Sequence, residues 1–187
     1  MKIVLLWAYS VWKTTISKHL QETFNLPLLP DIARLYAERH NIKFNEIKNP
    51  YDILNNQIGI AKLYKEIKES FTEWYIEDGS GILGIVYTNL FCSPIKETKE
   101  FKEWLDLIKS LNILPEDEIK ILLPISFPIK EDWLRHTDPI FQKKVENELL
   151  AYLNHNNINY YFVNELEKEK RKQIISEYIL NLNKNGK

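Results

Sequence analysis

Residues 3–15 read IVLLWAYSVWKTT, and this stretch decides the fold. Its first four residues form a continuous apolar run, which is typical of a strand buried on both faces of a parallel sheet. After the stretch, Ile16, Leu20 and Phe24 recur at helical spacing and predict an amphipathic helix over residues 14–24. A buried strand, a short loop and a helix in succession indicate the start of an α/β domain.

The loop between strand and helix matches part of a phosphate-binding pattern, G-x-x-x-x-G-K-[ST], in which backbone N–H groups, a lysine and a hydroxyl surround a polyphosphate. The lysine and hydroxyl positions are filled, whereas both glycine positions hold tryptophan. We expect Lys13 to reach the β- and γ-phosphates of a bound polyphosphate and the Thr14 hydroxyl to bind Mg²⁺. The predicted nucleotide contacts are Ser10, Val11, Trp12, Lys13, Thr14 and Thr15.

The tryptophans at positions 7 and 12 carry a physical penalty. Phosphate loops need glycine for positive φ angles and for close approach of the backbone to phosphate oxygens. A non-glycine residue in left-handed geometry costs roughly 1–2 kcal/mol. An indole in the loop also displaces charge-assisted hydrogen bonds worth about 1.5–3 kcal/mol each, which amounts to several powers of ten in affinity.

Weak or absent activity is therefore expected of the chain as written, either as a degenerate pseudo-enzyme or as a deliberately inactivated variant. The alternative is a non-catalytic interaction module that retains the fold. In that case the indoles of Trp7 and Trp12 would form an exposed apolar contact patch.

The remaining sequence continues to alternate strands with helices. We expect a three-layer, doubly wound α/β fold with about five parallel strands, in a single domain over residues 1–187. Further strands are predicted at 26–30, 74–76, 119–123 and 160–163. Helices are predicted from Asp31 to about residue 38, from Pro50 to about 67, over 82–91 and 101–111, from near Pro139, and over 174–182.

The composition excludes several classes of protein. The formal net charge is -1, and Lys and Glu alternate along the chain, so neither nucleic-acid nor membrane binding is expected. The only cysteine is Cys92, which excludes a disulfide framework and a thiolate metal site. No apolar run approaches the roughly 18 residues of a transmembrane helix. We expect a cytoplasmic protein; its oligomeric state is left open.

Residues 2–39 resemble the P-loop kinase and AAA-type ATPase proteins, which include nicotinamide riboside kinases and nucleotide kinases. Beyond the phosphate loop, the resemblance rests on PDIAR at 30–34, on EDGS at 77–80 with VYTN at 86–89, and on DWLRHTDP at 132–139. It extends more weakly over nearly the whole chain. The resemblance implies ATP-dependent phosphoryl transfer to a small nucleoside-like acceptor, with ATP and Mg²⁺ as cofactors.

The resemblance also implies roles for individual residues. Asp78 would hold Mg²⁺ through water, and Arg135, in a lid over about residues 126–139, would close over the transferred group. Asp31 and Arg34 would bind the acceptor, and Gln57 would touch its ring.

Each of these roles has a structural alternative. Asp31 can be a helix N-cap with Arg34 as its helix partner, and Gln57 an ordinary surface residue. The chain also departs from the family pattern where Gly79 stands in a position that often holds arginine. That loss would weaken the stabilisation of charge in the transition state.

Overall fold

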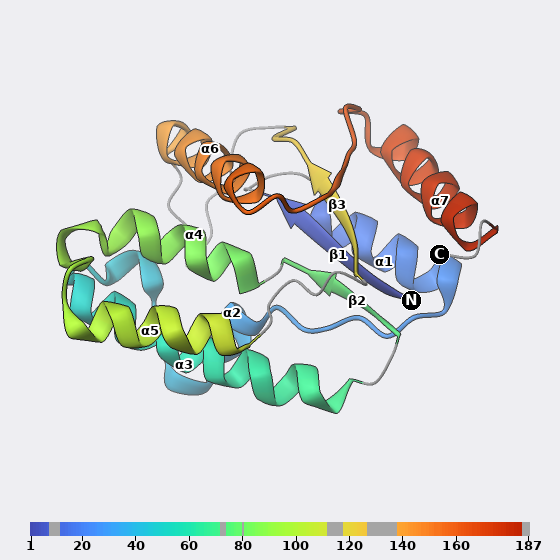
Figure 1. Cartoon of the computed structure of the whole chain (residues 1–187). Coiled ribbons are helices and arrows are strands. Elements are labelled where there is room, and N and C mark those ends of the chain that lie inside the picture. Colours follow the sequence, from blue (N-terminus) through green and yellow to red (C-terminus); the bar gives the residue numbers. More distant parts are fainter. Residues whose placement is uncertain (8–11, 72–73, 80, 112–117, 127–137, 185–187) are drawn as a thin grey trace.

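The computed structural model describes residues 1–7, 12–71, 74–79, 81–111, 118–126 and 138–184 (Figure 1). Strands and helices alternate along these residues, as the sequence predicted. The elements are β1 (Lys2–Trp7), α1 (Lys13–Phe24), α2 (Ile32–His40), η1 (Phe44–Glu46), α3 (Pro50–Ser70), β2 (Tyr75–Asp78), α4 (Gly81–Phe91), η2 (Ser93–Ile95), α5 (Lys99–Ser110), β3 (Glu118–Leu123), α6 (Pro139–His155), β4 (Tyr161–Phe162) and α7 (Lys168–Lys184).

The strands form one parallel sheet in the order β2-β1-β3-β4. Leu5 of β1 pairs with Asp78 of β2, and Trp7 pairs with Leu123 of β3. The chain therefore leaves β1 for a neighbour on one side and later adds strands on the other side. In such sheets a crevice opens at the carboxyl ends of the strands where the order reverses, here at the end of β1. The predicted α/β class is confirmed.

Among the residues that the structure describes, the sheet has four strands, where about five were predicted. The segment predicted as a strand over residues 26–30 makes only an isolated bridge between Leu28 and Ile76. The Leu29 N–H donates to the Ile76 carbonyl at 2.8 Å, and the Ile76 N–H donates to the Pro27 carbonyl at 2.8 Å. Pro27 faces β2 in this register but has no N–H to donate, so the pairing cannot be extended past it toward the amino terminus.

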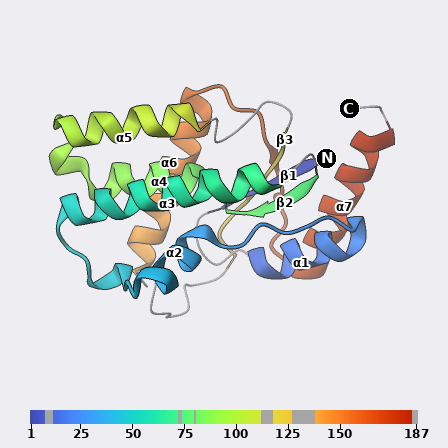
Figure 2. The ribbon, with the colours of Figure 1, turned by 90° about the horizontal axis from the view of Figure 1, so that it is seen from below.

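Helices cover both faces of the sheet. Figures 1 and 2 show α1 and α7 side by side on one face, with α3, α4 and α6 on the other. One apolar core joins the strands to these layers, and a second, which contains the buried Trp104, lies among α2, α3, α4 and α5. Within the described part of the chain, no helix is both long and apolar enough to cross a membrane.

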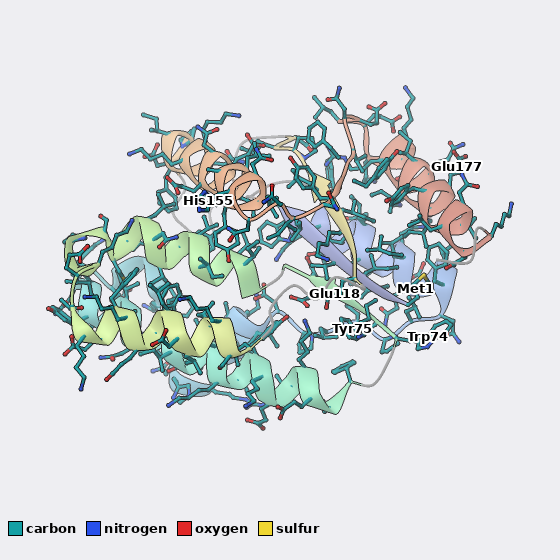
Figure 3. The ribbon with its side chains drawn as sticks, in the orientation of Figure 1. Met1, Trp74, Tyr75, Glu118, His155 and Glu177 are labelled. Atoms are coloured by element: carbon teal, nitrogen blue, oxygen red, sulfur yellow. The ribbon has the colours of Figure 1, made fainter. Side chains whose placement is uncertain are left out.

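A buried network of hydrogen bonds and ion pairs connects α3 to side chains of β2 and β3. Tyr75 of β2 and Glu118 of β3, the strands on either side of β1, point toward each other (Figure 3), and the Tyr75 hydroxyl donates to Glu118 Oε1 at 2.7 Å. Lys68 of α3 donates to Glu118 Oε1 at 3.0 Å and to the Tyr64 hydroxyl at 2.8 Å. The Tyr64 hydroxyl donates in turn to Glu77 Oε2 at 3.0 Å.

Burial raises the pKa of Glu77 to about 7, because the cost of removing its carboxylate from water outweighs the attraction of Lys68. The nearby Glu118 carboxyl adds to the rise. The folded protein thus keeps a proton on Glu77 that the unfolded chain releases above about pH 4.5. The contribution of Glu77 to stability is therefore complete at low pH and falls as the pH rises toward 7.

We expect Glu77→Gln to remove this pH dependence. The difference in unfolding free energy between wild type and variant should fall by on the order of 2–3 kcal/mol between about pH 4.5 and pH 7. Urea unfolding over that pH range measures it. Glu66→Gln, at an exposed position of α3, is the control and should give a constant difference. A constant difference for Glu77→Gln would contradict the raised pKa.

Candidate phosphate and acceptor site

The ammonium group of Lys13 lies at the carboxyl ends of β1 and β2. Lys13 Nζ is 3.3 Å from Asp31 Oδ2 and 4.0 Å from Asp78 Oδ1. It also lies 4.0 Å from the centre of the Trp7 ring, in a cation–π arrangement. Only 12% of the Lys13 side chain is exposed. In this structure the lysine is therefore held by two carboxylates and an indole.

Ser17 connects the first turn of α1 to Asp78. The Ser17 hydroxyl donates to the Thr14 carbonyl at 3.3 Å and lies 3.5 Å from Asp78 Oδ2. Ser17 is fully buried, whereas Thr14 is exposed. The carboxylate predicted to act with Mg²⁺ thus faces the same helical turn as the predicted Thr14 ligand.

Trp12 keeps the backbone geometry of a loop glycine. It is the N-cap of α1 and has φ 62 and ψ 22, in the left-handed region. The cost of this conformation for a non-glycine residue is roughly 1–2 kcal/mol. Its indole is 39% exposed, and Lys168 Nζ of α7 lies 5.6 Å from the centre of the ring. The Trp12 side chain therefore lies toward α7.

Trp7 lies on a different side of the site. Only 5% of it is exposed, and it lines a cavity of about 190 Å³. Gly79, just after β2, has φ 89, and a Cβ atom built on it would lie 2.8 Å from Trp7 Cζ2. The indole thus occupies the space that a side chain at position 79 would need.

The cavity has a polar end and an apolar body. Asp31, Arg34 and Asp78 lie at the end next to Lys13. Asn56 and Gln57 of α3 add two carboxamides. The rest of the lining is mostly apolar or aromatic, from α2, η1, α3, α4 and α5: Ile32, Phe44, Ile47, Ile53, Ile60, Leu83, Tyr87, Phe91 and Ile108. This arrangement suits a small, flat molecule with one polar end.

Asp31 has two contacts that stabilise its charged form. Burial alone would raise the pKa of its carboxyl, but the ammonium of Lys13 and the backbone N–H of Arg34 together bring the pKa below the ordinary value of 3.8. The Arg34 N–H donates to Asp31 Oδ1 at 3.1 Å, which makes Asp31 the N-cap of α2. Asp31 is therefore both a helix cap and part of the cavity lining.

The structure brings several predicted site residues together and leaves others outside the described residues. Four residues predicted to bind substrate or metal line the same cavity: Asp31, Arg34, Gln57 and Asp78. Lys13, Thr14 and Thr15 lie in the first turn of α1, next to its N-cap Trp12. Ser10, Val11 and Arg135 lie outside the described residues, as does most of the predicted lid.

Sequence reasoning missed two parts of the site. Ser17 lies four residues after Lys13 on the buried face of α1, a polar residue among apolar ones, and that placement could have revealed it. The position of Trp7 in the cavity was also missed, because the phosphate pattern places residue 7 in the loop and does not fix the direction of an indole there.

The described residues fit a Mg²⁺-nucleotide in part. Oxygen ligands such as the Thr14 hydroxyl and the Asp78 carboxylate suit Mg²⁺, which takes few protein ligands and relies on substrate phosphates. Bound there, the ion would neutralise phosphate charge during transfer. Lys13 would supply the positive charge on the protein's side, after release from its two carboxylate partners.

Solved structures with the same fold include several small-molecule kinases. Deoxyadenosine kinase from M. mycoides with bound dCTP superposes with a TM-score of 0.72 at 12% identity, over 97% of this chain and 100% of that chain. A NadR protein in complex with NAD and AMP-PNP gives 0.64 at 17% identity, over 88% and 44%. Shikimate kinase from Aquifex aeolicus gives 0.53 at 18% identity, over 99% and 98%. At these identities the likeness shows the fold alone.

Sequence comparison gives the family. The search of curated proteins finds no match. Residues 2–171 match a protein family described as an AAA domain. Since this match covers most of the chain and the fold agrees with it, the chain belongs to the AAA-domain family and has the fold of the P-loop kinase-like NTPases.

Proposed function

We propose that this protein is an ATP-dependent phosphotransferase of the P-loop kinase type, that its acceptor is a small nucleoside-like molecule, and that its nucleotide affinity is impaired. The observation that carries the proposal is the group of Lys13, Ser17 and Asp78. It lies beside a cavity at the carboxyl ends of β1 and β2, where the order of the strands reverses. Ligands of open α/β folds bind at this position.

The cavity supports the part of the proposal that concerns a nucleoside-like acceptor. Its aromatic and aliphatic body matches a planar ring, and the carboxamide of Gln57 can hydrogen-bond the ring's edge. Asp31 and Asp78 can accept hydrogen bonds from the hydroxyls of a sugar. A deoxyadenosine kinase and a NadR structure described as a complex with NR share the fold, which favours a nucleoside-like acceptor.

The second part of the proposal is that binding of the nucleotide is impaired. Lys13 is already paired with Asp31 and Asp78, so phosphate must compete with two carboxylates for its charge. The bulky residues at positions 7 and 12 replace the glycines that allow close approach of backbone to phosphate. In the proposed active form Arg135 closes over the transferred group.

The second candidate is a non-catalytic pseudo-kinase or interaction module that retains this fold. The exposure of the Trp12 indole favours it, because an aromatic side chain at a surface is suited to protein contact. Binding of Mg·ATP distinguishes the two candidates, since an interaction module has no need of it.

We expect Trp7→Gly combined with Trp12→Gly to raise the affinity for Mg·ATP by two or more powers of ten, because backbone hydrogen bonds to phosphate become possible. Isothermal titration calorimetry measures the affinity, and the rise in melting temperature with ligand concentration provides a second reading. Adding Lys13→Met to this pair should abolish the gain.

Trp74→Gly is the matched control for loss of indoles. Trp74 is 56% exposed and lies before the amino-terminal end of β2, whereas the site lies at the carboxyl end of that strand, so its removal should leave Mg·ATP affinity unchanged. If the double variant folds and binds Mg·ATP no better than wild type, impairment by the two indoles is wrong.

We expect Asp31→Asn to weaken acceptor binding and to change how the free energy of unfolding depends on pH in the acidic range. Asparagine keeps the cap of α2 but loses the ion pair with Lys13, which should cost about 0.5–1 kcal/mol at pH 7. Because the pKa of folded Asp31 lies below 3.8, this difference should persist above that pH and vanish as the pH falls through the folded pKa.

Urea unfolding of wild type and Asp31→Asn between pH 2 and 7 measures the difference. Asp31→Ala, which also removes the cap, should cost about 1 kcal/mol more. Acceptor affinity in the Asn variant should fall roughly five- to tenfold, as expected for replacing a charged acceptor by a neutral one. A pH-independent difference would argue against the Asp31–Lys13 pair.

A further inference from the structure

Trp7 and Gly79 are coupled through space at the end of two neighbouring strands. Trp7 ends β1, and Gly79 follows directly after β2. A Cβ atom at position 79 would lie 2.8 Å from Trp7 Cζ2 and 3.2 Å from both Cε2 and Nε1. Three atoms of the indole thus stand within the contact distance of a single side-chain carbon, and glycine at 79 is required for the indole to lie there.

The indole also sets the size of the cavity at its polar end. Trp7 lines the cavity with Asp31, Asp78 and Gly79, and the ring contacts the ammonium of Lys13. The cavity volume of about 190 Å³ is below the roughly 300–1,000 Å³ that is usual for small-molecule sites. The volume occupied by the indole is therefore removed from the end where the polar part of a ligand would lie.

Charge at this end does not by itself select between neutral and anionic ligands. Asp31 and Asp78 are balanced by Lys13 and Arg34, which lie at the same end. A phosphate group placed there could pair with Arg34, since guanidinium groups bind phosphate in bidentate fashion. Any exclusion of phosphate from the cavity must then be steric, and Trp7 is the residue whose side chain occupies this end of the cavity.

We propose that the Trp7–Gly79 pair determines acceptor specificity by admitting a nucleoside-like molecule that ends in a free hydroxyl and excluding the same molecule with a phosphate at that position. This inference rests on the proposed function, because it assigns the cavity to the acceptor. It gives Trp7 a role in the acceptor site that is separate from its effect on the nucleotide. Gly79 acts by leaving room for the indole.

The test compares deoxyadenosine with its 5′-monophosphate in the absence of ATP. By calorimetry, wild type should bind the nucleoside at least tenfold more tightly than the monophosphate. Trp7→Ala should reduce this ratio to near unity or reverse it, by raising affinity for the monophosphate. Adding Arg34→Gln to Trp7→Ala should remove the gain for the monophosphate. Trp74→Ala, which removes an exposed indole at the amino-terminal end of β2, away from the cavity, should leave the ratio unchanged.

Gly79→Ala provides a second test that does not remove a core side chain. In wild type it should lower the melting temperature and weaken nucleoside binding, because the new carbon displaces the indole. In the Trp7→Ala background the same substitution should lower the melting temperature less, since only the strain of the positive φ angle at residue 79 remains. Equal losses in the two backgrounds would overturn the coupling.

The outcomes separate this inference from the function on which it rests. Nucleoside binding with the same nucleoside-to-monophosphate ratio in wild type and Trp7→Ala overturns the inference and leaves the acceptor site standing. Failure of wild type and of every variant to bind either molecule overturns both. Should Trp7→Ala not fold, Trp7→Leu enlarges the same end of the cavity while retaining an apolar side chain, and the same comparison applies.

Discussion

Lys13 carries its positive charge into a nearly closed space, where two carboxylates and an indole surround it. A lone ammonium in that position would be costly, and so would two neighbouring carboxylates without it. The cluster joins the first turn of α1 to the cap of α2 and to the end of β2. The arrangement of the cavity's polar end follows from this one interaction, because Asp31 and Asp78 are both held by the same group.

Most of the fold follows from periodicity in the sequence. The apolar runs at residues 3–6 and 119–123 become central strands, and the helical spacing of Ile16 and Leu20 becomes the buried face of α1. The prediction of a strand at 26–30 was wrong, because hydropathy does not show that Pro27, which faces β2, lacks an N–H donor. The network of Tyr64, Lys68 and Glu118 was likewise beyond prediction, since it joins groups as far as 50 residues apart in the chain.

Sequence motifs located individual residues of the site, but they did not give the directions in which the side chains pack. The loop pattern located Lys13, and the EDGS motif at the end of β2 located Asp78; in the structure Lys13 Nζ lies 4.0 Å from Asp78 Oδ1. Their roles in binding remain predictions, as do those of Asp31, Arg34 and Gln57. The loop pattern treated Trp7 and Trp12 alike, yet one indole is buried in a cavity and the other lies exposed beside α7. Only the packing around each ring distinguishes them.

The close contact between Trp7 and Gly79 limits which residues this sequence can carry at the two positions. A Cβ atom at position 79 would lie 2.8 Å from the indole of Trp7, so any larger residue there requires the ring or the backbone after β2 to move. The φ angle of 89 at Gly79 adds a second, independent constraint, because side chains other than glycine rarely adopt it. Replacing Trp7 by a small residue would therefore remove the steric constraint on position 79 and leave the conformational one.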